Sequence, residues 1–450
     1  MSAGGFPEGV QLDGQISRRR RRGAYLRLSF LASLIVAVFA LLTLLYHIVN
    51  SAFGLVALES EVAPAALVES LGLDSTSSAL VDLSKDDLVT VLRTNINNNV
   101  GRSLERDQRF YDDRLVFETQ AKWDELCARA VDRPAGCSSG ARERDNVYAL
   151  IVEQIVQPRV QETWLLFDSI FHRAEIEERA AALYPSADLI FRSWLSVDFV
   201  TSPQSPQAEI AGVRTAILGS LWIVGVTILF SFPVGVGAAV YLEEYARDTR
   251  LNRLVQTNIN NLAGVPSIIY GMLGLAIFVR VLQAFTSGAA FGGVDGVTAN
   301  GRTVVSAGLT LGLLILPIII INAQEAIRAV PQSLRSAGMA LGASQWQTIR
   351  AHVLPNAIPG ILTGAILAVA RALGETAPLV VVGASTFITA DPTGPFSKFT
   401  ALPIQIFQWT SRPQDEFRNI AAAAIIVLLV LLLLLNATAI VLRNRYARRV

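Results

Sequence analysis

Six apolar runs dominate this sequence and limit what it can fold into. They cover about residues 25–49, 215–241, 262–285, 303–322, 360–382 and 420–442. Each has the length of about 20 residues that a helix needs to cross the hydrocarbon layer of a bilayer. With 52% hydrophobic and 17% charged residues, the chain is also too apolar for an ordinary soluble protein. We therefore predict an all-α polytopic membrane protein with six transmembrane helices.

Arginine clusters beside the apolar runs predict how the chain is oriented. The clusters lie at residues 18–22, 247–253 and 443–449. Loops rich in Lys and Arg remain in the cytoplasm, and six spans with a cytoplasmic N-terminus place all three clusters on that side. We therefore expect residues 1–24 and 443–450 to be cytoplasmic tails. A cleaved signal peptide is the alternative for the run at 25–49, but this run exceeds the usual ~7–15 apolar residues.

Residues 50–213 are polar and charged, unlike the runs on either side. We predict that they form an extracytoplasmic domain of mainly helical or mixed character between the first and second transmembrane helices. Cys127 and Cys137 are the chain's two cysteines, and they lack the neighbouring Cys or His pair of a zinc site. Either a disulfide or two free thiols is consistent with this spacing, and an oxidising compartment would favour the disulfide.

A polar segment at 324–359 separates the fourth and fifth apolar runs. Its pattern predicts two short helices hinged at Gly342. Pro331 suits the first turn of the first helix, because the proline lacks an N–H that this turn does not need. Ser344 and Gln347 have the spacing of a capping box for the second helix, which we expect Pro355 and Pro359 to interrupt. An ordinary helical hairpin at the membrane surface would also fit this pattern.

The hinge sequence S-A-G-x3-G-x9-H-V-L-P, at 336–355, resembles the EAA loop of ABC importer permeases. The family pattern is roughly E-A-A-x3-G-x9-I-x-L-P, and this copy departs from it at Ser336, Gly338 and His352. The resemblance implies that the loop docks on a separate ATPase subunit. The residues expected to form this coupling loop are Ser336, Ala337, Gly338, Gly342, Ala343, Trp346, Leu354 and Pro355.

Further motifs resemble the phosphate ABC transporter permease family called PstA. They are PVGVGAAVYLEEYA at 233–246, NLAGVPSIIYGMLGLAIF at 261–278 and ARALGETAPLVVVGAS at 370–385. The resemblance implies a permease domain of type I architecture at 214–442, in a bacterial inner membrane. It also implies phosphate as substrate, with a sister permease, two copies of a cytoplasmic ATPase and an extracytoplasmic phosphate-binding protein as partners. The sister permease itself, or a permease for another oxyanion, would fit similar motifs.

The chain contains no G-x-x-x-x-G-K-[ST] phosphate loop, so we do not expect it to hydrolyse ATP. We predict that the chain is not an enzyme and binds no metal or cofactor. ATP and Mg are expected to bind to the partner ATPase subunit. A net charge of +1, with arginines beside apolar runs, argues against a nucleic-acid partner. A membrane receptor is a more distant alternative, but it would need a cytoplasmic output domain larger than the predicted loops.

Two charged residues, Arg371 and Glu375, lie within the fifth apolar run. They are expected on one helical face near the middle of the bilayer, where a charge costs about 2.5–3.5 kcal/mol on insertion scales. Such residues usually face protein or water, and a guanidinium can donate two parallel hydrogen bonds to phosphate. Their spacing also resembles the R-x-x-x-E of the permease family. We therefore predict that Arg371, Glu375 and Thr376 line the substrate path, with a purely structural ion pair as the alternative.

Overall fold

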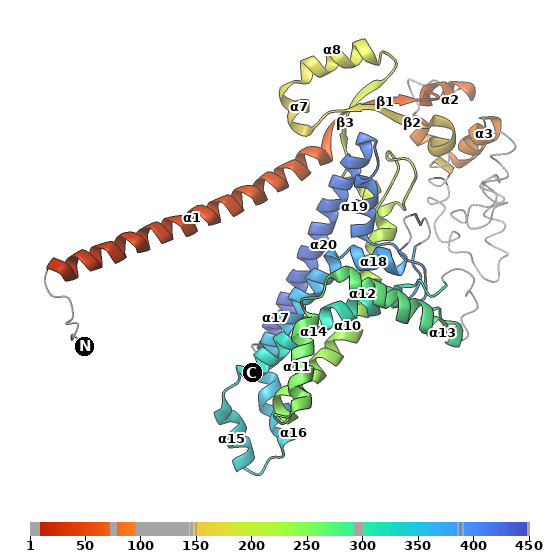
Figure 1. The fold of residues 1–450 in the computed structure, drawn as a ribbon. Helices are drawn as coiled ribbons and strands as arrows, with labels where there is room; N and C mark the ends of the chain where they lie inside the picture. Colours follow the sequence, from red (N-terminus) through yellow and green to blue (C-terminus); the bar gives the residue numbers. More distant parts are fainter. Residues whose placement is uncertain are drawn as a thin grey trace.

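The computed structural model describes residues 10–72, 79–95, 144, 147–148, 151–291, 300–384, 387–388 and 391–447. Within these residues the chain is mostly helical, as predicted, and its long helices other than the N-terminal one form a bundle (Figure 1). In this described part of the chain, five helices are long and apolar enough to cross a membrane, or six if one bent pair forms a single span. Cys127 and Cys137 lie outside the described residues, so their pairing stays a prediction.

The long helices largely coincide with five of the six predicted apolar runs, except that the first begins earlier, within the segment predicted as an N-terminal tail. They are α1 (Val10–Ala52), α10 (Arg214–Val240), α14 (Val304–Arg328), α17 (Leu354–Gly374) and α20 (Asp415–Ala447). Helix α14 is the most buried of them because α10 and α17 pack against it. Small residues allow these contacts: a Cβ on Gly308 would lie 2.6 Å from Val226, and one on Gly364 would lie 2.3 Å from Asn322. Close helix packing of this kind is typical within membranes.

The third predicted span, at 262–285, is broken. Helix α11 (Arg250–Leu262) ends before Pro266, and α12 (Ser267–Gly274) follows at an angle of 107°. The helix then continues as a π-helical segment, η5 (Leu275–Val281), and as α13 (Gln283–Thr286), with a short 3-10 turn, η6 (Ala289–Phe291), beyond. Pro266 has no N–H to extend α11 and disfavours a helical conformation at the residue before it. The two parts of this run therefore point in different directions, although both contact α14.

The fifth predicted span, at 360–382, also differs from a single helix. Helix α17 ends at Gly374, Glu375 is extended with ψ 122°, and a short helix α18 (Ala377–Val382) follows. At the other end, Pro355 and Pro359 do not interrupt the helix, contrary to the prediction. Pro355 lies in the first turn of α17, where its missing N–H is not needed. Gln345–Gly374 therefore forms one membrane-length helical segment.

A three-stranded antiparallel sheet begins directly after α1. Its strands are β1 (Phe53–Ser60), β2 (Pro158–Thr163) and β3 (Asp188–Ser193), in the order β2-β1-β3. The register places Leu55 opposite Phe191, and Val56 opposite Thr163. Around the sheet lie α2 (Pro64–Ser70), η1 (Leu80–Asp82), α3 (Lys85–Asn95), η3 (Val152–Val156), α7 (Leu166–Phe171), α8 (Arg173–Leu183) and α9 (Val197–Thr201). Of the two characters predicted for this segment, the described residues have the mixed one.

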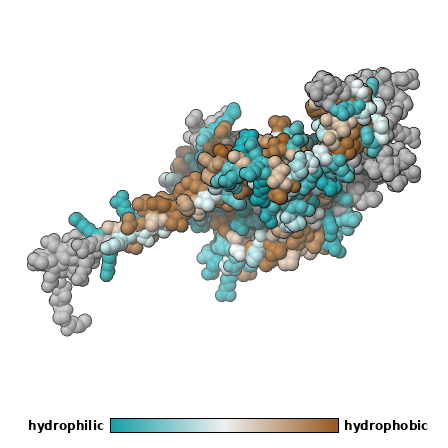
Figure 2. Space-filling model, turned by 90° about the horizontal axis from the view of Figure 1, so that it is seen from above, coloured by the Kyte–Doolittle hydropathy of each residue, from teal (hydrophilic) through white to brown (hydrophobic). Residues whose placement is uncertain are grey.

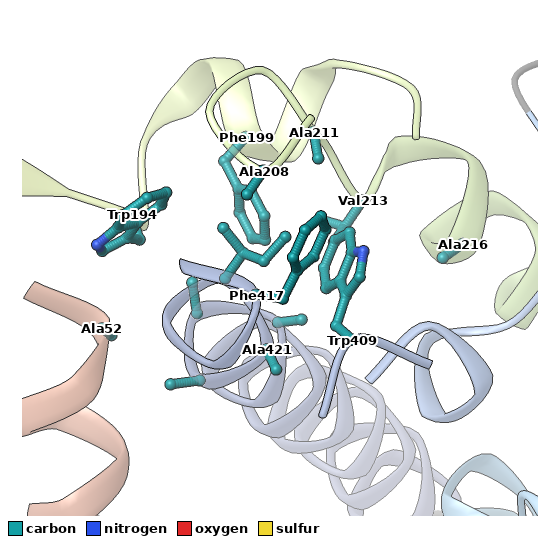
Figure 3. Close-up of a cluster of buried hydrophobic side chains, with 14 of the residues drawn as sticks. Ala52, Trp194, Phe199, Ala208, Ala211, Val213, Ala216, Trp409, Phe417 and Ala421 are labelled. Carbon is teal, nitrogen blue, oxygen red and sulfur yellow. The ribbon is translucent and has the colours of Figure 1, made fainter. Parts of the chain in front are cut away.

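The apolar core of residues 50–213 is divided in two. One cluster, which includes Leu88, Leu92 and Ile151, lies wholly within this segment. The other joins Trp194 and Phe199 to residues of α20 and of α19 (Leu402–Thr410), as Figure 3 shows around Trp409 and Phe417. The sheet region is therefore packed onto the helical bundle and is not a separate body on a flexible linker.

The bundle has two distinct ends (Figure 1). The sheet caps one end, and α11, α15 (Gln332–Ala340) and α16 (Gln345–Thr348) lie at the other, toward which the C-terminal end of α20 also runs. Helix α1 leaves the sheet end and extends away from the bundle. Its side chains from Tyr25 to Tyr46 are exposed, and Figure 2 shows a hydrophobic surface along this arm. Lipid would cover such a surface in a membrane.

Candidate functional site

The predicted hinge at 324–359 is formed by α15, a turn at Gly342, and α16. Gly342 has φ +84°, a conformation that glycine adopts without a steric penalty, and the Ala343 N–H donates to the Gly338 carbonyl at 3.1 Å. The capping box is present, because the Ser344 and Gln347 side chains each accept from the other residue's backbone N–H. A π-helical turn, η7 (Ile349–Val353), then connects α16 to α17.

Gly338 is the contact point between the two helices of the hinge. A Cβ at this position would lie 2.9 Å from Thr348 Oγ1, so a larger residue would push α15 away from α16. The departure from the second alanine of the EAA pattern therefore has a local structural reason. Gly338 is buried at this contact, whereas Leu334 and Leu341 are exposed.

The hinge presents an exposed surface at its tip. Leu341 is 90% exposed, and Met339 and Trp346 are also exposed. Trp346 is one of the predicted coupling residues, whereas Leu341 and Met339 are not. Of the remaining predicted residues, Ser336, Ala337 and Gly342 are exposed, and Ala343, Leu354 and Pro355 are partly buried. Ile349 and Val353 instead pack into the bundle with residues of α14. The loop thus has one face fixed on the bundle and one free of contacts within the described chain.

A largely buried ion pair, which the sequence reasoning did not identify, holds the hinge to the bundle. Arg335 of α15 donates to Glu244 of η4 (Tyr241–Tyr245), the π-helical end of α10, with Nη2–Oε1 2.8 Å. Their side chains are only 12% and 8% exposed. Arg335 also donates to the carbonyls of Ile327 and Val330, at the end of α14. One guanidinium therefore connects α15 to both α10 and α14.

Further polar contacts surround this pair. The Gln345 side chain donates to the Glu244 carbonyl, and Arg328 pairs with Glu243 at 2.5 Å on a more exposed side. Between η4, the end of α14 and the hinge lies a pocket of about 520 Å³. The only sequence signal for this network was the pair Glu243-Glu244 directly after an apolar run, and sequence offered no way to choose its partners among several arginines.

The predicted substrate-path residues meet where α17 ends. Arg371 Nε lies 3.4 Å from Glu375 Oε1, so the two residues are in contact. The prediction that both residues lie on one continuous helical face is wrong, because the helix ends at Gly374. Thr376 precedes α18 and is partly buried. Arg371 is 46% exposed, which leaves much of its guanidinium available to a group outside the described chain.

The depth of Arg371 follows from the packing of α17 on α14. Gly364 contacts Asn322 and Gly360 contacts Ala326, so the two helices are antiparallel. Seven residues beyond the first contact, Arg371 is level with about Ile315, near the middle of α14. Ala368 and Ala372, on either side of Arg371, belong to one apolar cluster with Ile315. The ion pair is therefore at mid-depth in the bundle.

Comparison with known proteins gives a consistent family assignment. The family described as "Binding-protein-dependent transport system inner membrane component" matches residues 231–450. The phosphate transport system permease protein PstA of Haemophilus influenzae is 35% identical over 228 residues, which cover 50% of this chain and 74% of that protein. A probable ABC transporter permease of Bacillus subtilis, YqgI, is 35% identical over 218 residues, which cover 48% of this chain and 68% of that protein.

Solved structures of ABC transporters are also similar. An inward-facing structure of the MetNI methionine ABC transporter has a TM-score of 0.39 and 18% identity, with 52% of this chain and 95% of that chain covered. A bacterial alginate ABC transporter, in complex with an alginate-bound periplasmic protein, has a TM-score of 0.42 and 18% identity, with 68% and 96% covered.

Proposed function

Because this chain belongs to the PstA-type family of ABC transporter permeases, we propose that it is the transmembrane subunit of an ATP-driven phosphate importer. It would form one half of the translocation path, and a sister permease would form the other half. An ATPase subunit, bound in two copies, would supply the energy, and an extracytoplasmic phosphate-binding protein would deliver the anion. Both termini and the hinge would then face the cytoplasm.

The observation that carries the phosphate assignment is the Arg371–Glu375 pair at a helix break at mid-depth. Discontinuous helices near the middle of the membrane recur at substrate sites of transporters, because an open turn leaves backbone groups free to line the path. Exposure of Arg371 to lipid would be costly. Its exposed guanidinium is better placed against the sister permease or a water-filled path, where it can bind a phosphate oxygen pair.

Coupling to the ATPase would use the free face of the hinge. The Arg335–Glu244 pair fixes this hinge to the ends of α10 and α14, so a movement of α15 is passed to both helices. The hinge also continues without interruption into α17, which carries Arg371. An ATPase that moves the hinge would thereby act on the walls of the path and on its charged pair.

Cross-linking tests this coupling surface. In a variant with Cys127→Ser and Cys137→Ser, Ala343→Cys should cross-link to the ATPase through a short thiol-to-amine reagent, because Ala343 lies at the hinge turn. Leu251→Cys, on the exposed surface of α11 at the same end of the bundle, is the matched control and should react much less. Cross-linking at residue 251 with none at 343 would contradict the proposed docking surface.

A further inference from the structure

Helix α7 exposes apolar side chains on one face. Phe167, Ile170 and Phe171 have the i, i+3, i+4 spacing of neighbours on a helix, and they are 45%, 61% and 66% exposed. The rings of Phe167 and Phe171 lie 4.5 Å apart, so the side chains form one continuous surface. A surface helix of a soluble domain would turn such a face toward the core.

Specific hydrogen bonds hold α7 in this orientation. Ser169, on the opposite side of the helix, is buried, and its Oγ accepts from the Leu55 N–H at 2.8 Å. The Phe167 N–H donates to Asn50 Oδ1 at 2.7 Å. These bonds join α7 to the first residues of β1 and the last turn of α1. The outward direction of the phenylalanines is therefore part of the fold.

The position of α7 indicates what covers this face. Asn50 lies one helical turn beyond Tyr46 on α1, whose apolar side chains are exposed as expected for a helix surrounded by lipid. The α7 face thus lies beside the end of α1 that adjoins the sheet (Figure 1). The next helix, α8, is different, because its exposed residues include Glu175, Glu177 and Glu178. Helix α8 and strand β3 also expose apolar side chains, including Leu183 and Phe191, but the three-residue face of α7 is the one that adjoins α1.

We propose that α7 is a membrane-surface anchor, whose Phe167, Ile170 and Phe171 insert into the lipid interface beside the outer end of α1. Helices that lie in the membrane interface bury side chains such as Phe and Leu at the boundary between headgroups and acyl chains, without spanning the bilayer. The anchor holds the sheet at a fixed height and angle on the membrane. This proposal requires that α1 crosses the membrane, but it does not depend on which substrate is transported.

Lipid-quenching fluorescence tests the proposal in the full-length protein. The fluorophore NBD is attached at Phe171→Cys in the background lacking Cys127 and Cys137, and the protein is placed in phospholipid nanodiscs. Nitroxide on the upper acyl chain should quench this probe several-fold more strongly than a probe at Glu178→Cys on α8. Aqueous iodide should show the opposite order. Ile170→Cys provides a second position on the same face and should behave like residue 171.

Each other outcome overturns the anchor. Equal iodide quenching at 171 and 178 would show that the face is in water. Protection of residues 170 and 171 from both iodide and nitroxide would show that protein covers them, as a sister permease or binding protein would. Far-ultraviolet circular dichroism and a single monodisperse elution peak establish that each labelled variant has kept its fold.

Discussion

Arg371→Gln should nearly abolish phosphate uptake while the protein remains in the membrane at its normal level. Glutamine removes the positive charge that is proposed to bind the anion at mid-depth, and it also leaves Glu375 without its partner. Arg371→Lys keeps the charge but loses the planar fork that can donate two parallel hydrogen bonds. We expect uptake by the lysine variant to be sharply reduced, and to lie between those of the wild type and the glutamine variant.

Uptake is measured in cells, and the membrane level of the subunit and its retention of the ATPase are measured in parallel. Glu375→Gln is the matched control, since it breaks the same ion pair and leaves the arginine in place. Near-normal uptake by Arg371→Gln at normal abundance would contradict the role in the path. If both the Arg371 and the Glu375 variants lost phosphate uptake because the subunit was missing from the membrane, the ion pair would instead be structural.

Glu244→Leu should destabilise the chain by about 3–5 kcal/mol, because it leaves the buried Arg335 guanidinium without its countercharge. The double variant Glu244→Leu, Arg335→Met removes both charges and should recover much of this loss. Glu243→Leu is the control: its partner Arg328 is largely exposed, and such pairs contribute about 0–1 kcal/mol. Thermal unfolding of the purified protein measures the order of the three variants.

The same variants separate stability from coupling. If the pair transmits movement from the hinge, the double variant should bind the ATPase and fold stably, yet transport less phosphate per ATP hydrolysed. Equal unfolding temperatures for the Glu244 and Glu243 variants would show that the buried pair has no special role. Full transport by the double variant would show that the mechanical link lies elsewhere in the hinge.

Local patterns in the sequence were sufficient for several features of this fold. The apolar runs located the long helices, since a span is defined by length and hydropathy alone. Gly342 and the pair Ser344 and Gln347 predicted the turn and the capping box, because these depend on residues within a few positions of one another. The contact between Arg371 and Glu375 was also found from their spacing.

Features that depend on distant contacts were not predicted. The sequence near Glu375 does not mark the end of α17 uniquely. Gly374 and Pro378 lie there, but glycine and proline are also tolerated inside transmembrane helices. The partners of Glu244 lie about 90 residues away in sequence, and the core around Trp409 joins segments about 200 residues apart. The apolar face of α7 has only three residues, too few to stand out from a short core helix.

The proposed function is tested most directly by phosphate uptake into proteoliposomes. This chain is reconstituted with its sister permease and ATPase, with Mg-ATP on the ATPase side and the phosphate-binding protein on the other. We predict uptake of labelled phosphate that requires ATP, is not diminished by excess sulfate, and is lost in liposomes containing the Arg371→Gln variant. Uptake that proceeds without ATP, or no phosphate uptake by an assembled complex that hydrolyses ATP, would contradict the assignment.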